Sequence, residues 1–209
     1  CPTLLRNGFG GHRIEGIGDK HVPWIHNVRN TDMIIAVDDE ITMRLLRLFN
    51  DSVGREFLVN EGVDEELVKN LDLLGISSIG NLLASIKYAK YYELDENDVV
   101  LTVFTDSMEL YGSRMQELHN AHGSYTDVKA GQDYELLQNI KIDNTLEMNY
   151  YQKKIVHNLK YYTWIEQQGK TFEQIQSQWY DRDYWTNFQK QIPEIDERIQ
   201  ELNERVGLL

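Results

Sequence analysis

Residues 33–49 have the sequence MIIAVDDEITMRLLRLF and decide what kind of fold the chain encodes. Their first five residues form a short apolar run, as is typical of strands buried on both faces. Asp38 and Asp39 follow as N-cap candidates, and Ile41 and Leu45 recur at the spacing of an amphipathic helix. Strand, cap and helix in this order are half of a βαβ unit. The sequence therefore predicts an α/β fold in which a parallel or mixed sheet is flanked by helices.

Further elements of the same kind occupy the first half of the chain. Asp64 is placed to cap a second helix, and residues 75–80 (GISSIG) lead into a third one that continues to about residue 94. The glycine-serine turn before this third helix is either a plain helix cap, which is the simpler interpretation, or an anion site at the helix N-terminus. Residues 99–104 (VVLTVF) predict a second buried strand, which ends in Thr105, Asp106 and Ser107.

The second half of the chain has a different character. From about residue 115 helical patterns rich in aromatic residues dominate, and Thr171 with Gln174 forms a capping box. Pro193 suits the first turn of a last helix, which Gly207 ends. Apolar residues recur in that helix at intervals of 4, 3 and 4, at Ile195, Ile199, Leu202 and Val206. We therefore predict an α/β part in residues 1–118 and a helical, aromatic-rich extension in residues 119–209.

The composition of the chain limits which partners it can bind and in which cellular compartment we expect it. The chain has 209 residues and a formal net charge of -13, which repels a phosphate backbone, so we expect no nucleic-acid partner. No apolar run approaches the roughly 18 residues that span a bilayer, so we expect no membrane partner. A single cysteine, Cys1, excludes an internal disulfide and fits a reducing compartment. These features predict a cytoplasmic protein.

Residues 13–23, RIEGIGDKHVP, carry two glycines around one isoleucine. Gly16 and Gly18 indicate a backbone that turns sharply or admits a close neighbour. The segment is either an ordinary loop or a backbone wall that lies against a flat ligand. His12, His21 and His26 are spaced 9 and 5 residues apart around it, without a helical His-x-x-x-His pattern, so we predict no metal site.

Four blocks occur in an order that resembles a known family: IEGIGDKHVPWIHN, TDMIIAVDDEITMRLLRLF, GISSIGNLLASIKYA and DVVLTVFTDSMELYGSRM. They are similar to the C-terminal part of the catalytic domain of fold-type II pyridoxal-phosphate enzymes, the family of cystathionine β-synthase and cysteine synthase. The resemblance covers roughly residues 1–114. It implies a tryptophan synthase β-like fold, pyridoxal 5'-phosphate as the cofactor, an amino-acid substrate and a homodimer.

The resemblance also implies that part of the enzyme lies upstream. In this family the lysine that carries the cofactor as a Schiff base, the substrate-carboxylate loop and the phosphate-binding turn all precede the matched blocks. Lys20 lies inside the glycine block and does not replace that lysine. Because the chain also opens Cys1-Pro2 without Met, we expect it to be the C-terminal fragment of a longer enzyme whose missing N-terminal half is its partner, with no catalytic residue of its own.

Site residues follow from the same resemblance. Gly16, Ile17 and Gly18 lie beside the cofactor plane in the family, and Ser107 there donates to the pyridine nitrogen; the alternative for Ser107 is a helix cap. A hydroxyl at this nitrogen leaves the ring largely neutral, which suits β-elimination or β-replacement on serine-, O-acylserine- or cysteine-like amino acids.

Two acidic residues, Glu15 and Asp106, remain as candidates for the substrate pocket, and the sequence does not decide what either one does. Glu15 either supports the glycine segment, faces the substrate or forms a surface salt bridge, and Asp106 precedes Ser107 in the matched motif. Three departures limit the match: a long link before residue 75, Ile79 in place of a small residue, and Thr105 in place of proline. The alternative function is a catalytically silent α/β binding or regulatory subunit.

Overall fold

The structure is a computed structural model that describes residues 2–14 and 16–208. Helices dominate it, and the described residues contain one two-stranded sheet. The strands are β1 (Met33–Ile35) and β2 (Thr145–Glu147). The helices are α1 (Asp39–Asn50), α2 (Ser52–Asn60), α3 (Glu65–Lys69), α4 (Ile76–Tyr91), α5 (Gly112–His122), α6 (Asp127–Gln138), α7 (Tyr150–Asn158), α8 (Phe172–Tyr180), α9 (Tyr184–Gln189) and α10 (Ile192–Val206). Short 3-10 or π-helical segments cover Thr3–Asn7, Val28–Asn30, Leu71–Leu73, Met108–Tyr111 and Tyr161–Ile165.

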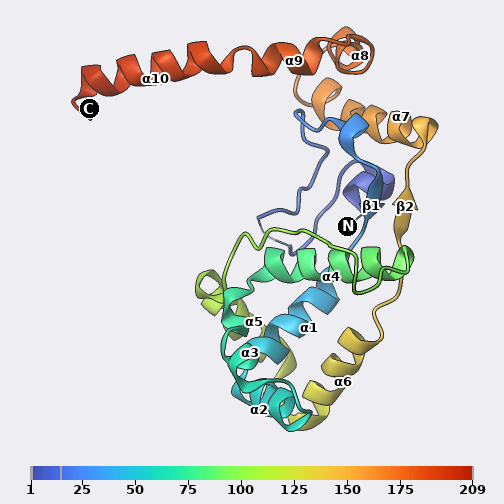
Figure 1. The fold of residues 1–209 in the computed structure, drawn as a ribbon, viewed down its shortest axis with the longest axis vertical. Coiled ribbons are helices and arrows are strands. Elements are labelled where there is room, and N and C mark those ends of the chain that lie inside the picture. The colour runs from blue at the N-terminus through green and yellow to red at the C-terminus, as the bar shows by residue number, and fades with distance from the viewer. Residues whose placement is uncertain (1, 15, 209) are drawn as a thin grey trace.

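The main core lies around α1. Leu45, Leu46 and Leu48 of this helix are fully buried, and α2, α4, α5 and α6 pack around it (Figure 1). Burying one such side chain contributes about 1.5 to 3 kcal/mol to the free energy of unfolding. Since α6 lies beyond residue 118, contacts of this core cross the predicted boundary between the α/β part and the extension.

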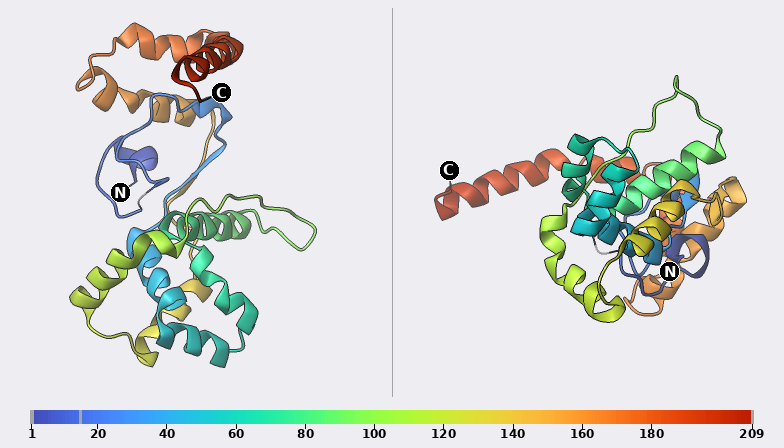
Figure 2. Two further views of the ribbon diagram at one scale, coloured as in Figure 1. Left: turned by 90° about the vertical axis from the view of Figure 1, so that its left-hand side faces the viewer. Right: turned by 90° about the horizontal axis from the view of Figure 1, so that it is seen from below.

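A second, smaller core joins the N-terminal segment to the extension. It contains Val28, Ile34, Met148, Val156 and Trp179, so residues from both ends of the sequence share it. Figure 2 shows the two cores as separate masses connected by the long segments that carry β1 and β2. Three tryptophans of the extension are shielded, because Trp179 is buried and Trp164 and Trp185 are half-buried, whereas Tyr151 and Tyr180 are exposed.

Several helix boundaries confirm the sequence predictions. The Asp38 side chain accepts from the Glu40 N–H at the start of α1, and the Asp64 side chain accepts from the Leu67 N–H at the start of α3. Both bonds of the predicted capping box at Thr171 and Gln174 are present in α8. Each of these caps lies within three residues of its donor, which is why local sequence reveals it.

The sheet departs from the prediction. β1 forms where a strand was predicted but is shorter, and it pairs antiparallel with β2, with Ile34 opposite Leu146. Residues 99–104 are not a strand: they run extended without a strand partner among the described residues, and Leu101 is 92% exposed. The prediction of two buried strands in a parallel or mixed sheet is therefore wrong for the described residues. An apolar run becomes an inner strand only where neighbours exist to accept its hydrogen bonds.

Candidate functional site

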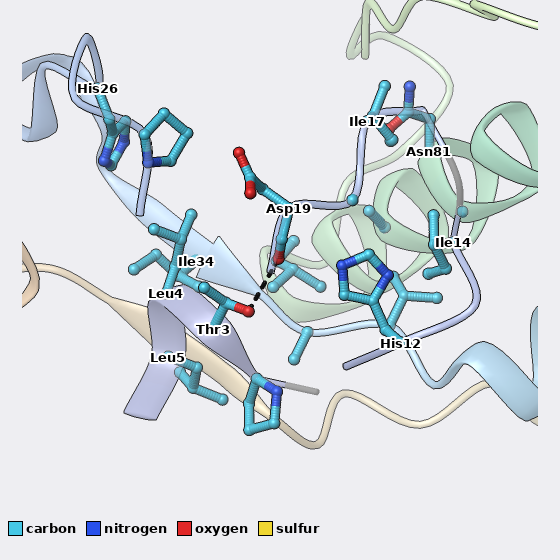
Figure 3. Close-up of a pocket in the computed structure, with 18 of the residues that line it drawn as sticks. Thr3, Leu4, Leu5, His12, Ile14, Ile17, Asp19, His26, Ile34 and Asn81 are labelled. Carbon is cyan, nitrogen blue, oxygen red and sulfur yellow. Dashed lines mark hydrogen bonds between the residues drawn. The ribbon is translucent and has the colours of Figure 1, made fainter. Parts of the chain in front are cut away.

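An apolar cavity of about 310 Å³ lies between the N-terminal segment, β1 and α4. Ile14, Ile17 and Val37 contribute aliphatic walls, and Gly80 and Ala84 of α4 form a floor of small side chains. Figure 3 shows the His12 ring between Ile14 and the segment that carries Asp19. A cavity of this size, largely apolar with a few polar groups, is typical of small-molecule sites.

The glycine loop, which we define as residues 16–18, forms one wall of this cavity and is fixed to α4. The Ile17 N–H donates to Ser77 Oγ at 3.2 Å. Gly16 has φ +104°, and a β-carbon there would lie 2.7 Å from the same Ser77 oxygen. The close approach of the loop to the helix therefore requires glycine at position 16.

Gly18 is required by a different neighbour. A β-carbon at this position would lie 2.3 Å from the Ile14 carbonyl oxygen and 2.4 Å from His12 Cε1. Both distances are far below van der Waals contact. The His12 ring therefore packs directly against the backbone of Gly18, which leaves no space for a side chain at this position. The sequence left open whether this segment is an ordinary loop or a wall against a ligand, and contacts within the chain already account for both glycines.

Asp106 holds the N-terminus of α4. Its carboxylate accepts from the backbone N–H groups of Ser77 at 2.9 Å and Ser78 at 2.8 Å, and from the Tyr111 hydroxyl at 2.7 Å. Burial would raise the pKa of Asp106, but hydrogen bonds from Ser78, Tyr111 and Ser77 lower it below the ordinary value. The turn at residues 75–80 was predicted to be either a helix cap or an anion site. It is both, because the carboxylate of Asp106 is the anion that caps the N-terminus of α4.

Ser77 brings two of the four sequence blocks together. Its N–H donates to Asp106 and its Oγ accepts from Ile17, so the glycine loop and the segment of Asp106 meet at one end of α4. Asp106 itself does not line the described cavity, and neither does Ser107, which is half-buried and whose carbonyl accepts from the Leu110 N–H at 3.3 Å. The prediction for Glu15 lies outside the described residues.

Sequence reasoning missed the polar groups of the cavity. Neither ring nitrogen of His12 has a hydrogen-bond partner among the described residues, although both atoms are buried. His26 Nδ1 is in the same state, while His26 Nε2 lies 3.0 Å from the Thr31 hydroxyl. Burial, and then the charge of Lys160, lowers the pKa of His26. The sequence signal that could have indicated these polar groups is the presence of three histidines near the two glycines. His12, His21 and His26 all line this cavity.

Neither a metal centre nor a membrane span emerges from the described residues. No group of three or more His, Cys, Asp or Glu side chains in this part of the chain is arranged to hold a metal ion. Within residues 2–14 and 16–208, no helix combines the length and the apolar character that crossing a bilayer requires.

Comparison with known proteins gives partial likeness to two synthases. The chain is 28% identical over 110 residues to cystathionine beta-synthase of Saccharomyces cerevisiae, which covers 52% of this chain and 18% of that protein. It is 29% identical over 110 residues to cysteine synthase B of Campylobacter jejuni, covering 53% of this chain and 30% of that protein. The chain thus spans less than a third of either relative. No family model and no solved structure matches it. This distant, partial likeness is consistent with a piece of that group of synthases.

Proposed function

We propose that this chain is the C-terminal part of a pyridoxal-phosphate-dependent lyase or synthase that performs β-elimination or β-replacement on a serine-, O-acylserine- or cysteine-like amino acid. The observation that carries the proposal is the glycine loop, held by Ser77 against α4 as the wall of an apolar cavity. The glycine block is also one of the four blocks on which the resemblance rests. The likeness to two synthases over 110 residues supports the same assignment.

The cavity fits one part of the cofactor. Its aliphatic walls at Ile14, Ile17 and Val37 suit the faces of a flat ring, and the unpartnered nitrogens of His12 are available to polar substituents. The described lining contains no lysine or arginine, and the N-terminus of α4 already binds the Asp106 carboxylate. We infer that the phosphate is bound by another part of the protein, which is the role of the upstream phosphate-binding turn that the resemblance implies.

Each residue of the site has a defined task in this proposal. When bound, pyridoxal phosphate supplies an electron-withdrawing ring that makes the α-proton of an amino acid acidic. Ile14 and Ile17 would exclude water from the ring face. Ser107 lies outside the lining of the cavity as described, next to the α4 cap, and the resemblance implies that its hydroxyl would donate to the ring nitrogen in the complete protein. A hydroxyl at this place keeps the ring weakly electron-withdrawing, which suffices when a leaving group departs from the β-carbon.

The exposed run at residues 99–104 also supports the proposal. Val99, Leu101 and Val103 are 90%, 92% and 65% exposed. An exposed apolar segment without a strand partner is what an inner strand becomes without its neighbours. In the proposed enzyme, the rest of the catalytic domain supplies those neighbours.

A pair of substitutions on α4 tests the site. Ala84 lines the cavity and Ala89, on the same helix, does not, while leucine and alanine both favour helices. In the complete protein, Ala84→Leu should fill the cavity, so that pyridoxal phosphate is lost on dialysis, as measured by absorbance of the bound cofactor. Ala89→Leu should retain it. Equal retention by both folded variants would place the cofactor elsewhere, and absence of cofactor from the unsubstituted protein would favour the silent binding module.

The role of Ser107 is tested by kinetics. Ser107→Ala in the complete protein should keep the cofactor and slow loss of the α-proton, because one hydrogen bond worth about 0.5 to 1.5 kcal/mol disappears, which corresponds to roughly 2- to 10-fold. An α-deuterated substrate should then show a larger isotope effect than with the unsubstituted enzyme. Ser124→Ala, at an exposed serine, is the control. Unchanged rates in Ser107→Ala would show that the Ser107 hydroxyl does not contact the ring nitrogen.

A further inference from the structure

Helix α10 carries an exposed apolar stripe, which we define as Ile192, Ile195, Ile199, Leu202 and Val206. These side chains are between 48% and 59% exposed. Figures 1 and 2 show α10 extending away from both cores at the C-terminal end of the chain. Helices in soluble proteins normally bury such a stripe, because its exposure to water costs free energy.

The spacing of the stripe is that of a coiled coil. Its members follow one another at intervals of 3, 4, 3 and 4 residues, which places Ile192, Ile199 and Val206 at the a positions of a heptad and Ile195 and Leu202 at the d positions. β-branched residues at a, with leucine at one of the two d positions, favour two parallel strands. This pattern therefore specifies both the kind of partner and its direction.

The charges beside the stripe discriminate between the two directions. In this heptad register, Arg198 and Arg205 occupy g positions, and Asp196 and Asn203 occupy e positions. A parallel in-register pair places Arg198 opposite Asn203 of a second copy. An antiparallel pair places Arg198 near Arg205 of the second copy, twice by symmetry, which is unfavourable. Glutamates lie on the outer face, at Glu194, Glu197, Glu201 and Glu204.

We propose that α10 pairs with α10 of a second copy of this chain as a parallel, in-register, two-stranded coiled coil. The pairing covers the stripe on both copies at once, because a two-fold axis brings identical surfaces together. It rests on the sequence and exposure of α10 and does not depend on the proposed enzyme activity.

Two features make this dimer concentration-dependent and salt-dependent. The stripe spans only about two heptads, which is short for a coiled coil. Each copy carries a formal net charge of -13, so the two bodies repel one another at low ionic strength. Added salt screens this repulsion while the apolar seam persists. Dimerisation should therefore strengthen with sodium chloride, whereas an interface held by ion pairs would weaken.

Sedimentation of the full chain over a concentration series tests the proposal. The unsubstituted chain should approach twice the monomer mass as concentration and salt rise. Leu202→Asp, in the seam, should remain monomeric throughout, while Gln200→Asp, on the outer face of the same helix, should still dimerise. A monomer under all conditions for the unsubstituted chain, or a dimer of equal strength in Leu202→Asp, would overturn the proposal. A fall in melting temperature in Leu202→Asp with no change in mass would show that α10 packs on its own chain and would equally overturn it.

Cysteine cross-linking tests the direction. In a Cys1→Ser background, Ile195→Cys should form a disulfide between two copies of residue 195, because in-register parallel helices bring equal positions together. An antiparallel pair would separate those residues by about 16 Å, since 11 residues rise about 1.5 Å each, and would instead cross-link a chain that carries both Ile195→Cys and Val206→Cys between residues 195 and 206. The second pattern, or no cross-link, would contradict the parallel coiled coil.

Discussion

Asp106 stabilises the chain in a way that a single residue change can measure. Its carboxylate satisfies two backbone N–H groups at the start of α4 and one tyrosine hydroxyl. Asp106→Asn should lower the free energy of unfolding by roughly 0.5 to 2 kcal/mol, the usual range for a lost cap. Urea unfolding at neutral pH measures this, with the exposed Asp72→Asn as the control. Equal midpoints in both variants would contradict the capping role.

The same residue also has a predictable pH dependence. Because the pKa of Asp106 is lower in the folded state than its ordinary value, the unfolded state binds more protons as acid is added. Its contribution is therefore complete above the ordinary value of 3.8 and is lost as pH falls through the lowered pKa. The stability of Asp106→Asn should accordingly fall less steeply in acid than that of the unsubstituted chain.

Lys160 gives a prediction of the same sign in a more alkaline pH range. It is fully buried, and its ammonium donates to the carbonyl oxygens of Trp24 and His26 and to the Gln178 side chain. Burial lowers the pKa of Lys160 from 10.5 to about 7. Between these values the unfolded state binds more protons, so the free energy of unfolding should rise as pH rises from about 7 towards 10.

Removing the titrating group tests this directly. Lys160→Met should be less stable at every pH, because its carbonyl partners lose their donor. It should also lose the gain in stability between pH 7 and pH 9 in urea unfolding. Lys141→Met, at an exposed lysine, should keep that gain. A gain that persists unchanged in Lys160→Met would show that other groups cause it.

The sequence revealed interactions at this scale only where both partners are close in the chain. Asp38 and Asp64 cap helices that begin one residue later, and residue type with position is enough to predict them. Asp106 caps a helix that begins 30 residues upstream, and Gly18 is required by a ring six residues away on a folded loop. No local pattern encodes those encounters, because tertiary packing creates them.

At the scale of elements, α1 organises the main core. Leu46 is fully buried on this helix, and Leu67 of α3 is 56% exposed. Leu46→Ala should cost about 2 to 5 kcal/mol of unfolding free energy, since the cavity left behind adds to the lost burial. Leu67→Ala should change it by less than about 0.5 kcal/mol. Urea unfolding checks both variants, and similar losses would place the core elsewhere.

Helices with a clear apolar period were predictable as elements, and the pairing of the sheet was not. The period of α1 and α10 is visible in any window of their own residues, so each was predicted with nearly correct ends. A strand depends on its neighbour. The partner of β1 is β2, more than 100 residues later, and the three residues of β2 give too weak a pattern to predict. Residues 99–104 have the composition of a strand, yet they have no strand partner among the described residues.

At the scale of the molecule, segments from both halves of the chain form each core. Ala130 of α6 and Met148, which follows β2, are buried beside residues from the first 50 positions. The division at residue 118 reflects a real change in composition, but packing crosses it. The run at residues 99–104 and the α10 stripe are both open to solvent. We propose different coverings for them: the rest of the catalytic domain for the first, and a second copy for the other.

The central claim is that the cavity beside the glycine loop receives the cofactor ring in the complete protein. The most direct measurement is an experimental structure of the complete protein with pyridoxal phosphate bound. We expect the ring in van der Waals contact, within about 4 to 4.5 Å, with Ile17 and Ile14. We also expect Ser107 at its nitrogen and residues 99–104 paired as an inner strand. A ring bound away from α4, with upstream side chains filling this cavity, would contradict the account.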